Sequence, residues 1–181
     1  LSNLLANQYD EETIAFVLNE YRINFEYSHY IAIVIYFPNI SQKELDHRVM
    51  NYLDEHLEMD DMQCYILNRK KPGHIFMLVN AAEEVLEWDN FEPMLRKLYN
   101  KISNDLHISA VIAAGNVCNS VLQVPDSARE AMSCVYYGIS KMSCNIIRYS
   151  DIDVKHITDL IPDVTADIIK SVKCGNINEI Q

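Results

Sequence analysis

The chain has 181 residues, 49% of them hydrophobic, which is typical of one soluble globular domain with a sizeable core. Its formal net charge of −11 disfavours a nucleic-acid surface, because phosphate binding needs a basic patch. No apolar run approaches the roughly 20 residues of a membrane helix, and we find no secretory signal. The five cysteines never form Cys-x-x-Cys, so we expect unpaired thiols in a reducing cytoplasm rather than a disulfide or metal framework.

The first predicted elements are a helix and a buried strand. Residues 10–21 carry acidic side chains in their first turn and an apolar stripe at helical spacing, formed by Ile14, Val17, Leu18 and Tyr21. Residues 30–37 are rich in β-branched and aromatic side chains and are followed by Pro38. A continuous apolar run of this length predicts a central strand that is covered on both faces.

The clearest helix start in the chain lies at Ser41. Ser41 and Glu44 have the spacing of a capping box, in which the Ser oxygen accepts the N3 amide and the Glu side chain reaches back to the Ser amide. Ile40 and Leu45 fit a hydrophobic staple. The helix should run to about Glu58, with an apolar stripe through Leu45, Val49, Tyr52, Leu53 and Leu57.

A hairpin and a long helix follow. Residues 63–68 and 74–80 predict two strands, and residues 69–73 have the composition and length of a turn. Residues 89–106 predict an amphipathic helix, because one face holds Phe91, Leu95, Leu98, Ile102 and Leu106.

The last part of the chain alternates strands and helices. Residues 108–114 and 145–149 predict short strands, and residues 125–137 a helix with Ala128, Ala131, Met132 and Val135 facing inward. Residues 162–173 predict a terminal helix with Gly175 just past its end. The order β-α-β-β-α-β, then α-β, predicts an α+β fold, ferredoxin-like and nucleotide cyclase-like, with helices packed on an antiparallel-dominated sheet.

Two segments of this fold lack the acidic residues that phosphoryl-transfer chemistry needs. Neither residues 27–43 nor residues 65–82 contain an Asp or Glu. Such a site needs acidic oxygens to hold hard divalent cations against a triphosphate. We therefore expect a regulatory module rather than an enzyme, with no catalytic residue, no metal ligand and no cofactor.

Three patterns in the second half of the chain carry a family resemblance. A short strand ends in Gly115, a helix carries Ser127 and Glu130 in a Ser-x-x-Glu-Ala pattern, and a strand closes on Tyr149-Ser-Asp-Ile152. In this order they resemble the degenerate GGDEF-like regulatory domains of bacterial AraC-family transcription regulators, both response regulators and membrane-anchored versions. The resemblance covers most of the chain, from residue 1 to residue 181.

The resemblance also locates the missing acids. In active diguanylate cyclases the hairpin carries Gly-Gly-Asp/Glu-Glu-Phe. The matching turn here resembles residues 72–76, which keep one Gly and the Phe, while His74 and Ile75 replace the acids. The strand that ends near Tyr36 and Phe37 lacks its acid as well.

By this resemblance the chain divides into a lead-in helix (residues 1–28), a degenerate GGDEF-like α+β domain (residues 29–152) and a connector helix (residues 153–181). The parent protein would carry a helix-turn-helix DNA-binding domain after Gln181, and a receiver domain of a two-component system or a membrane sensor before Leu1. We expect a cytoplasmic module, or the cytoplasmic part of a membrane-anchored regulator, that contacts neither DNA nor membrane itself. A module that senses a small molecule or nucleotide without turnover is the alternative, and a divergent cyclase is the third interpretation.

Four side chains at the hairpin form the candidate ligand site. Arg69, Lys70, Lys71 and His74 could grip a phosphate, although a solvated charged turn is the competing interpretation. For Ser127 we expect a helix cap rather than a nucleophile, because no His lies at a spacing that suggests a base. The terminal helix either pairs with a second copy in a homodimer or docks on its own domain through Ile161, Val164, Ile168, Ile169 and Val172.

Overall fold

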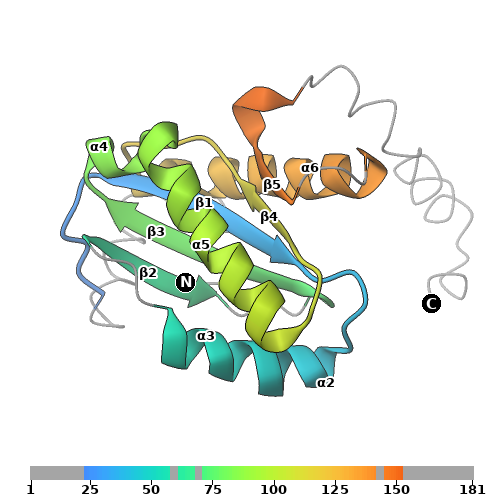
Figure 1. Ribbon diagram of the computed structural model, residues 1–181. Coiled ribbons are helices and arrows are strands. Elements are labelled where there is room, and N and C mark those ends of the chain that lie inside the picture. The colour runs from blue at the N-terminus through green and yellow to red at the C-terminus, as the bar shows by residue number, and fades with distance from the viewer. Residues whose placement is uncertain (1–22, 58–60, 68–70, 142–144, 153–181) are drawn as a thin grey trace, which may run out of the picture.

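The computed structural model describes residues 23–57, 61–67, 71–141 and 145–152, and within them a five-stranded sheet forms the centre (Figure 1). The strand order is β2-β3-β1-β4-β5. β1 pairs antiparallel with β3 and β4, β2 pairs antiparallel with β3, and β4 and β5 are parallel. This confirms the predicted α+β class. The strands are β1 (His29–Tyr36), β2 (Met62–Leu67), β3 (His74–Ala81), β4 (Val111–Ala114) and β5 (Ile146–Arg148).

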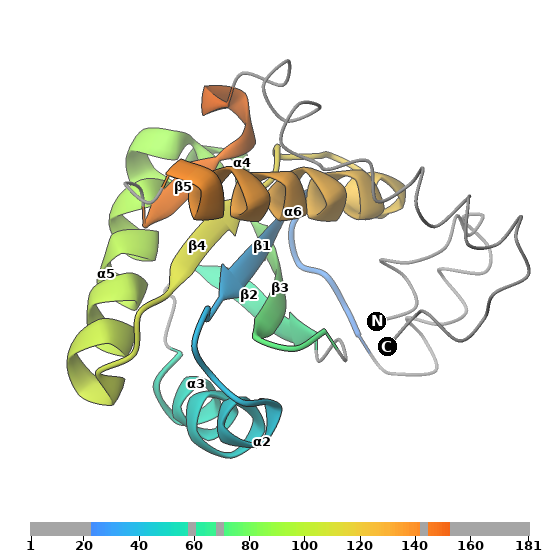
Figure 2. The same ribbon diagram turned by 90° about the vertical axis from the view of Figure 1, so that its right-hand side faces the viewer.

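Helices cover both faces of this sheet, and the two faces differ in how many helices they carry (Figure 2). On one face lie the helix after β1, divided into α2 (Gln42–Glu44), a π-helical turn (Leu45–Val49) and α3 (Met50–His56), and then α4 (Glu83–Leu86) and α5 (Trp88–Leu106). On the other face α6 (Val124–Lys141) packs against β1, β4 and β5.

β1 lies in the middle of the sheet and is covered from both sides. Ile31, Ile33 and Ile35 pack in the core beneath α5, whereas Ala32 and Val34 pack in the core beneath α6. Successive side chains of a strand point to opposite faces, so a strand buried on both faces needs apolar residues at every position. This explains the uninterrupted apolar run in the sequence.

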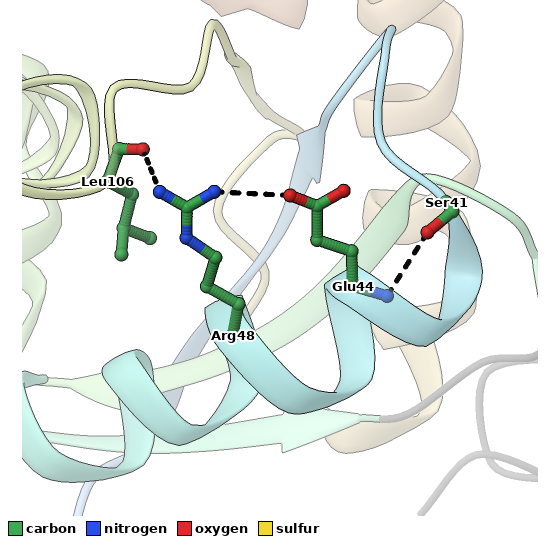
Figure 3. A network of polar contacts seen from close by, with 4 residues as sticks. All are labelled: Ser41, Glu44, Arg48 and Leu106. Carbon is green, nitrogen blue, oxygen red and sulfur yellow. Dashed lines mark hydrogen bonds and ion pairs between the residues drawn. The ribbon is translucent and has the colours of Figure 1, made fainter.

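The helix after β1 starts as predicted but continues differently. The Oγ of Ser41 accepts a hydrogen bond from the Glu44 amide at 3.3 Å. The Glu44 carboxylate does not complete a capping box; its Oε1 accepts from Nη1 of Arg48 at 3.1 Å instead (Figure 3). The π-helical turn at residues 45–49 interrupts the α-helical pattern, and the helix ends at His56 rather than at Glu58.

Arg48 also joins this helix to the end of α5. Its Nη2 donates to the carbonyl of Leu106 at 2.6 Å (Figure 3). Leu106 is the last residue of α5, and His107 follows it in the left-handed conformation, with φ of 53°. A cation that binds a final carbonyl satisfies an unpaired acceptor and complements the helix dipole. The five apolar residues predicted for the inner face of α5 are all buried.

Two predicted helices, at residues 10–21 and 162–173, lie outside the described residues. Among the helices that the structure describes, none is long and apolar enough to span a membrane.

We expect Arg48→Met to lower the free energy of unfolding by about 1 kcal/mol, because it removes a charged hydrogen bond at the end of α5. Arg96→Met is the matched control: Arg96 forms an i,i+4 pair with Glu92 on the surface of α5, and such pairs contribute only about 0.3–0.5 kcal/mol. Urea unfolding measures both. Equal losses would mean that the contact with Leu106 adds nothing beyond an exposed ion pair.

Candidate functional site at the hairpin end of the sheet

The end of β1 lies beside the tight turn that precedes β3. The amide of Phe37 donates to the carbonyl of Gly73 at 2.8 Å, and Tyr36 lies opposite His74 in the register of the two strands. Gly73 has φ of +71°, and a Cβ atom there would lie 2.8 Å from the carbonyl oxygen of Phe37. Only glycine fits this position without strain, which is a physical reason for the single glycine in the turn.

His74 is buried at this end, with 8% of its surface exposed. Its ring lies 4.7 Å from the ring of Tyr36, and its Nδ1 lies 2.7 Å from the carbonyl oxygen of Pro72. A carbonyl only accepts, so we assign the proton to Nδ1. Nε2 is then a buried acceptor with no hydrogen-bond partner among the described residues. Burial lowers the pKa of His74; the hydrogen bond to Pro72 opposes this effect and Lys71 adds to it, and because the net shift is downward the ring is neutral at neutral pH.

Lys71 contacts Tyr136 on α6, so its ammonium group already has a partner within the domain. Its Nζ donates to the hydroxyl of Tyr136 at 2.9 Å and lies 5.1 Å from the centre of that ring. The contact combines a hydrogen bond with a cation–π interaction and ties the hairpin to α6. Arg69 and Lys70 lie outside the described residues, so the four-residue phosphate site stays a prediction.

His74 and Ile75, which we expected at the positions of the motif's acids, both lie in packed surroundings. Ile75 belongs to the core beneath α5, whereas His74 lies on the face that α6 covers, beside Tyr36. Phe37, the residue after β1, is buried too. In the described part of the chain, no group of three or more His, Cys, Asp or Glu residues is arranged to hold a metal ion.

A second cluster holds the loop after β4 against α6. The Oγ of Ser127 accepts from the amide of Ala32 at 3.0 Å and donates to the carbonyl of Asn116 at 2.8 Å. The expectation that Ser127 caps a helix start is wrong, because α6 begins at Val124 and Ser127 already lies within it. Its hydroxyl instead joins β1 to the loop.

Gly115 and Glu130 complete this cluster. A Cβ atom on Gly115 would lie 2.0 Å from the carbonyl oxygen of Ser127, so α6 can approach the end of β4 only where there is no side chain. The Glu130 carboxylate accepts from the amide of Asn116 at 2.8 Å and from its Nδ2 at 3.1 Å. The Ser-x-x-Glu pattern after Gly115 therefore marks the contacts that hold α6 against the loop after β4. The sequence analysis did not predict Asn116, which bonds both Ser127 and Glu130.

Three tyrosines near the C-terminal end of the described chain are divided between solvent and core. Tyr136 is exposed on α6, whereas Tyr137 and Tyr149 pack against the core beneath that helix. Packing of this kind is typical of aromatic residues that cover the end of a sheet.

A family model described as a GGDEF-like domain matches residues 6–136, which is well over half of the chain. The chain belongs to the GGDEF-like domain family. The match includes the hairpin, the loop after β4 and most of α6. The sheet with packed helices agrees with the nucleotide cyclase-like fold expected for this GGDEF-like domain. Comparison with curated proteins gives no match.

We expect this GGDEF-like domain to lose stability as the pH falls below about 6.5, the ordinary pKa of histidine. The unfolded chain then binds a proton that buried His74 does not accept, so acid favours unfolding. His74→Phe keeps a ring beside Tyr36 and removes the titration. Its free energy of unfolding should fall less than that of the wild type between pH 7.5 and 5.5, measured with urea.

The control for this experiment is His47→Gln, because His47 is exposed. It should follow the wild-type pH dependence. Parallel pH profiles for His74→Phe and the wild type would contradict the assignment of a depressed pKa to His74.

A second variant tests the Ser127 contacts. Ser127→Ala leaves the Ala32 amide and the Asn116 carbonyl without their partner, and a buried unpaired group costs about 1–3 kcal/mol. Ser133→Ala is the matched control on the same helix, since the Ser133 hydroxyl donates to the carbonyl of Arg129 on the surface. We expect urea unfolding to show a clear loss for the first variant and almost none for the second, and similar losses would be inconsistent with the structure.

Proposed function

We propose that this chain is a non-catalytic signalling domain that relays an upstream signal to a downstream helix-turn-helix DNA-binding domain. Membership of the GGDEF-like family supports the signalling part of this proposal. The assignment to an AraC-type transcription regulator rests on the resemblance of the patterns around Gly115, Ser127 and Tyr149. In such a regulator the domain itself binds neither DNA nor membrane, and it lies in the cytoplasm.

One observation carries the non-catalytic part. Both segments that face the nucleotide in active cyclases lack acidic residues, and the residues at the positions resembling the acids are buried, His74 at 8% and Ile75 at 2% exposure. Phosphoryl transfer from a nucleoside triphosphate needs carboxylates that hold magnesium against the phosphates. A buried imidazole and an isoleucine supply neither charge nor exposed oxygen atoms.

A relay needs two arrangements of the same packed elements rather than a chemical step. An upstream partner that favours one arrangement and a downstream partner that reads it are coupled through the free-energy difference between the two. We assign α6 as the element whose packing would change, because it is the single α-helix of its layer among the described residues. Polar contacts with the Asn116 loop hold it at one end, and Lys71 holds Tyr136 nearer its other end.

The second candidate function is ligand sensing without turnover. The observation that favours it is the composition of the hairpin, where three basic residues precede His74. A nucleotide or other phosphate compound is the ligand class that this charge would attract.

Two measurements on the purified chain separate these functions. With GTP or ATP and magnesium or manganese, we expect no cyclic nucleotide product; detectable product would overturn the non-catalytic proposal.

In a thermal-shift screen with nucleotides and metabolites, we expect no compound to raise the midpoint of thermal unfolding. A ligand at about 100 times its Kd adds about 2.7 kcal/mol of stability, so a rise of several degrees with one compound would favour the sensing function instead.

The context of the regulator has its own test. Two helix-turn-helix units in the parent protein after Gln181 support the AraC-type assignment, and a different kind of domain at that place contradicts it. The proposed homodimer rests on the apolar stripe in residues 161–172, outside the described residues, and a monomer in sedimentation would remove it.

A further inference from the structure

Residues 23–28, which lead into β1, lie against the sheet on the face opposite α5, and we call them the entry strap (Figure 2). Exposure alternates along the strap: Phe25 and Tyr27 are half-buried, whereas Asn24, Glu26 and Ser28 are exposed. The ring of Phe25 meets the rings of Tyr30 and Tyr65 edge-to-face, at 5.1 Å and 5.5 Å between centres. The strap therefore has one side that is built to pack on the sheet.

A side-chain amide on β2 holds the outer half of the strap. Gln63 accepts from the amide of Glu26 at 3.1 Å and donates to the carbonyl of Asn24 at 3.2 Å. This pair of bonds resembles what a neighbouring strand would provide, although the strap itself is not a strand.

Asn80 on β3 holds the inner half. Its Oδ1 accepts from the amide of Tyr27 at 3.1 Å, and its Nδ2 donates to the carbonyls of Tyr27 and His29, at 2.8 Å and 2.9 Å. Asn80 is fully buried, and both of its N–H groups and its oxygen are used. A buried amide with every group paired fixes its partners in place, because breaking any bond leaves a polar group unsatisfied.

These contacts are aligned across the sheet. Gln63 lies opposite Asn80, Asn80 lies opposite Tyr30, and Tyr30 forms an antiparallel bridge with Cys118 in the loop after β4. Both backbone bonds of that bridge are 2.8 Å long. Two residues before Cys118, Asn116 is held by Glu130 of α6. One row of contacts thus connects the segment that enters the domain to the helix on the same face.

We propose that the entry strap is the input element of the domain. In this proposal its hydrogen bonds with Gln63 and Asn80 are coupled to the contact between Asn116 and Glu130. A pull on the residues before Tyr30 disturbs the bridge to Cys118, and the loop transmits this displacement to the first half of α6. The inference rests on the proposed relay function and names its regulation. It requires coupling in both directions, because linkage between two sites is reciprocal.

Amide hydrogen exchange by NMR on the whole chain tests the coupling. Gln63→Leu removes the two outer bonds of the strap at a half-buried position and should leave the fold intact. We expect roughly tenfold faster exchange at Glu26, the change that follows from one lost hydrogen bond. The decisive result is a faster exchange also at Asn116, which Gln63 does not contact. Amides in the middle of α5 serve as the reference for global opening.

The reverse experiment removes the other end of the row. Glu130→Ala should speed exchange at Asn116 directly, and at Glu26 and Tyr27 through the row of contacts. Asn90→Ala is the control: the Nδ2 of Asn90 also donates to a backbone carbonyl, that of Glu84 at 2.7 Å, but between α4 and α5, outside the row. It should change neither the strap nor the Asn116 loop.

Exchange that changes only at the amide whose bond was removed, in either variant, would overturn the coupling. That outcome would leave the absence of nucleotide turnover untouched. Conversely, cyclic product from GTP would overturn the proposed function without altering the exchange result, so the two failures can be told apart.

Discussion

The burial of β1 from both sides is the constraint on which the described structure depends. Apolar side chains fill both cores, but the backbone of the strand also needs partners where its neighbours stop pairing. Beyond the end of β4, the Ser127 hydroxyl accepts a hydrogen bond from the Ala32 amide, and the Gly115 amide donates to the Ala32 carbonyl. Cys118 and Tyr30 form a backbone bridge with two hydrogen bonds. Because a buried unpaired amide costs about 1–3 kcal/mol, these contacts fix the loop after β4 and the first turns of α6.

Packing of side chains closes the hairpin end of the sheet. Tyr36 and His74 cover each other where β1 and β3 meet, and Lys71 extends from the turn to Tyr136 on α6. In an active cyclase this end must present carboxylates to magnesium and phosphate. Here it is closed by packing, which is why we propose transmission of packing changes, rather than chemistry, as the work of the domain.

Sequence patterns predicted those features whose cause is local. The buried face of α5 follows from a repeat of 3.6 residues, and the start at Ser41 follows from the reach of one side chain to an amide three residues on. The role of Ser127 did not follow, because its hydroxyl serves a strand amide 95 residues away. Glu44 has a local partner, because Arg48 lies four residues on, but the bond from Arg48 to the carbonyl of Leu106 joins residues 58 apart and could not be predicted from the sequence.

The sequence by itself determined the class of the fold and the absence of acids at the hairpin end, since periodicity and residue type are properties of the chain alone. Only the tertiary structure decided which side chains hold segments together. Asn80 is an ordinary polar residue in the sequence, yet the sheet buries it where it pairs two backbone segments. Such pairing depends on which strands become neighbours, and hydrogen bonds between distant residues leave no periodic trace in the chain.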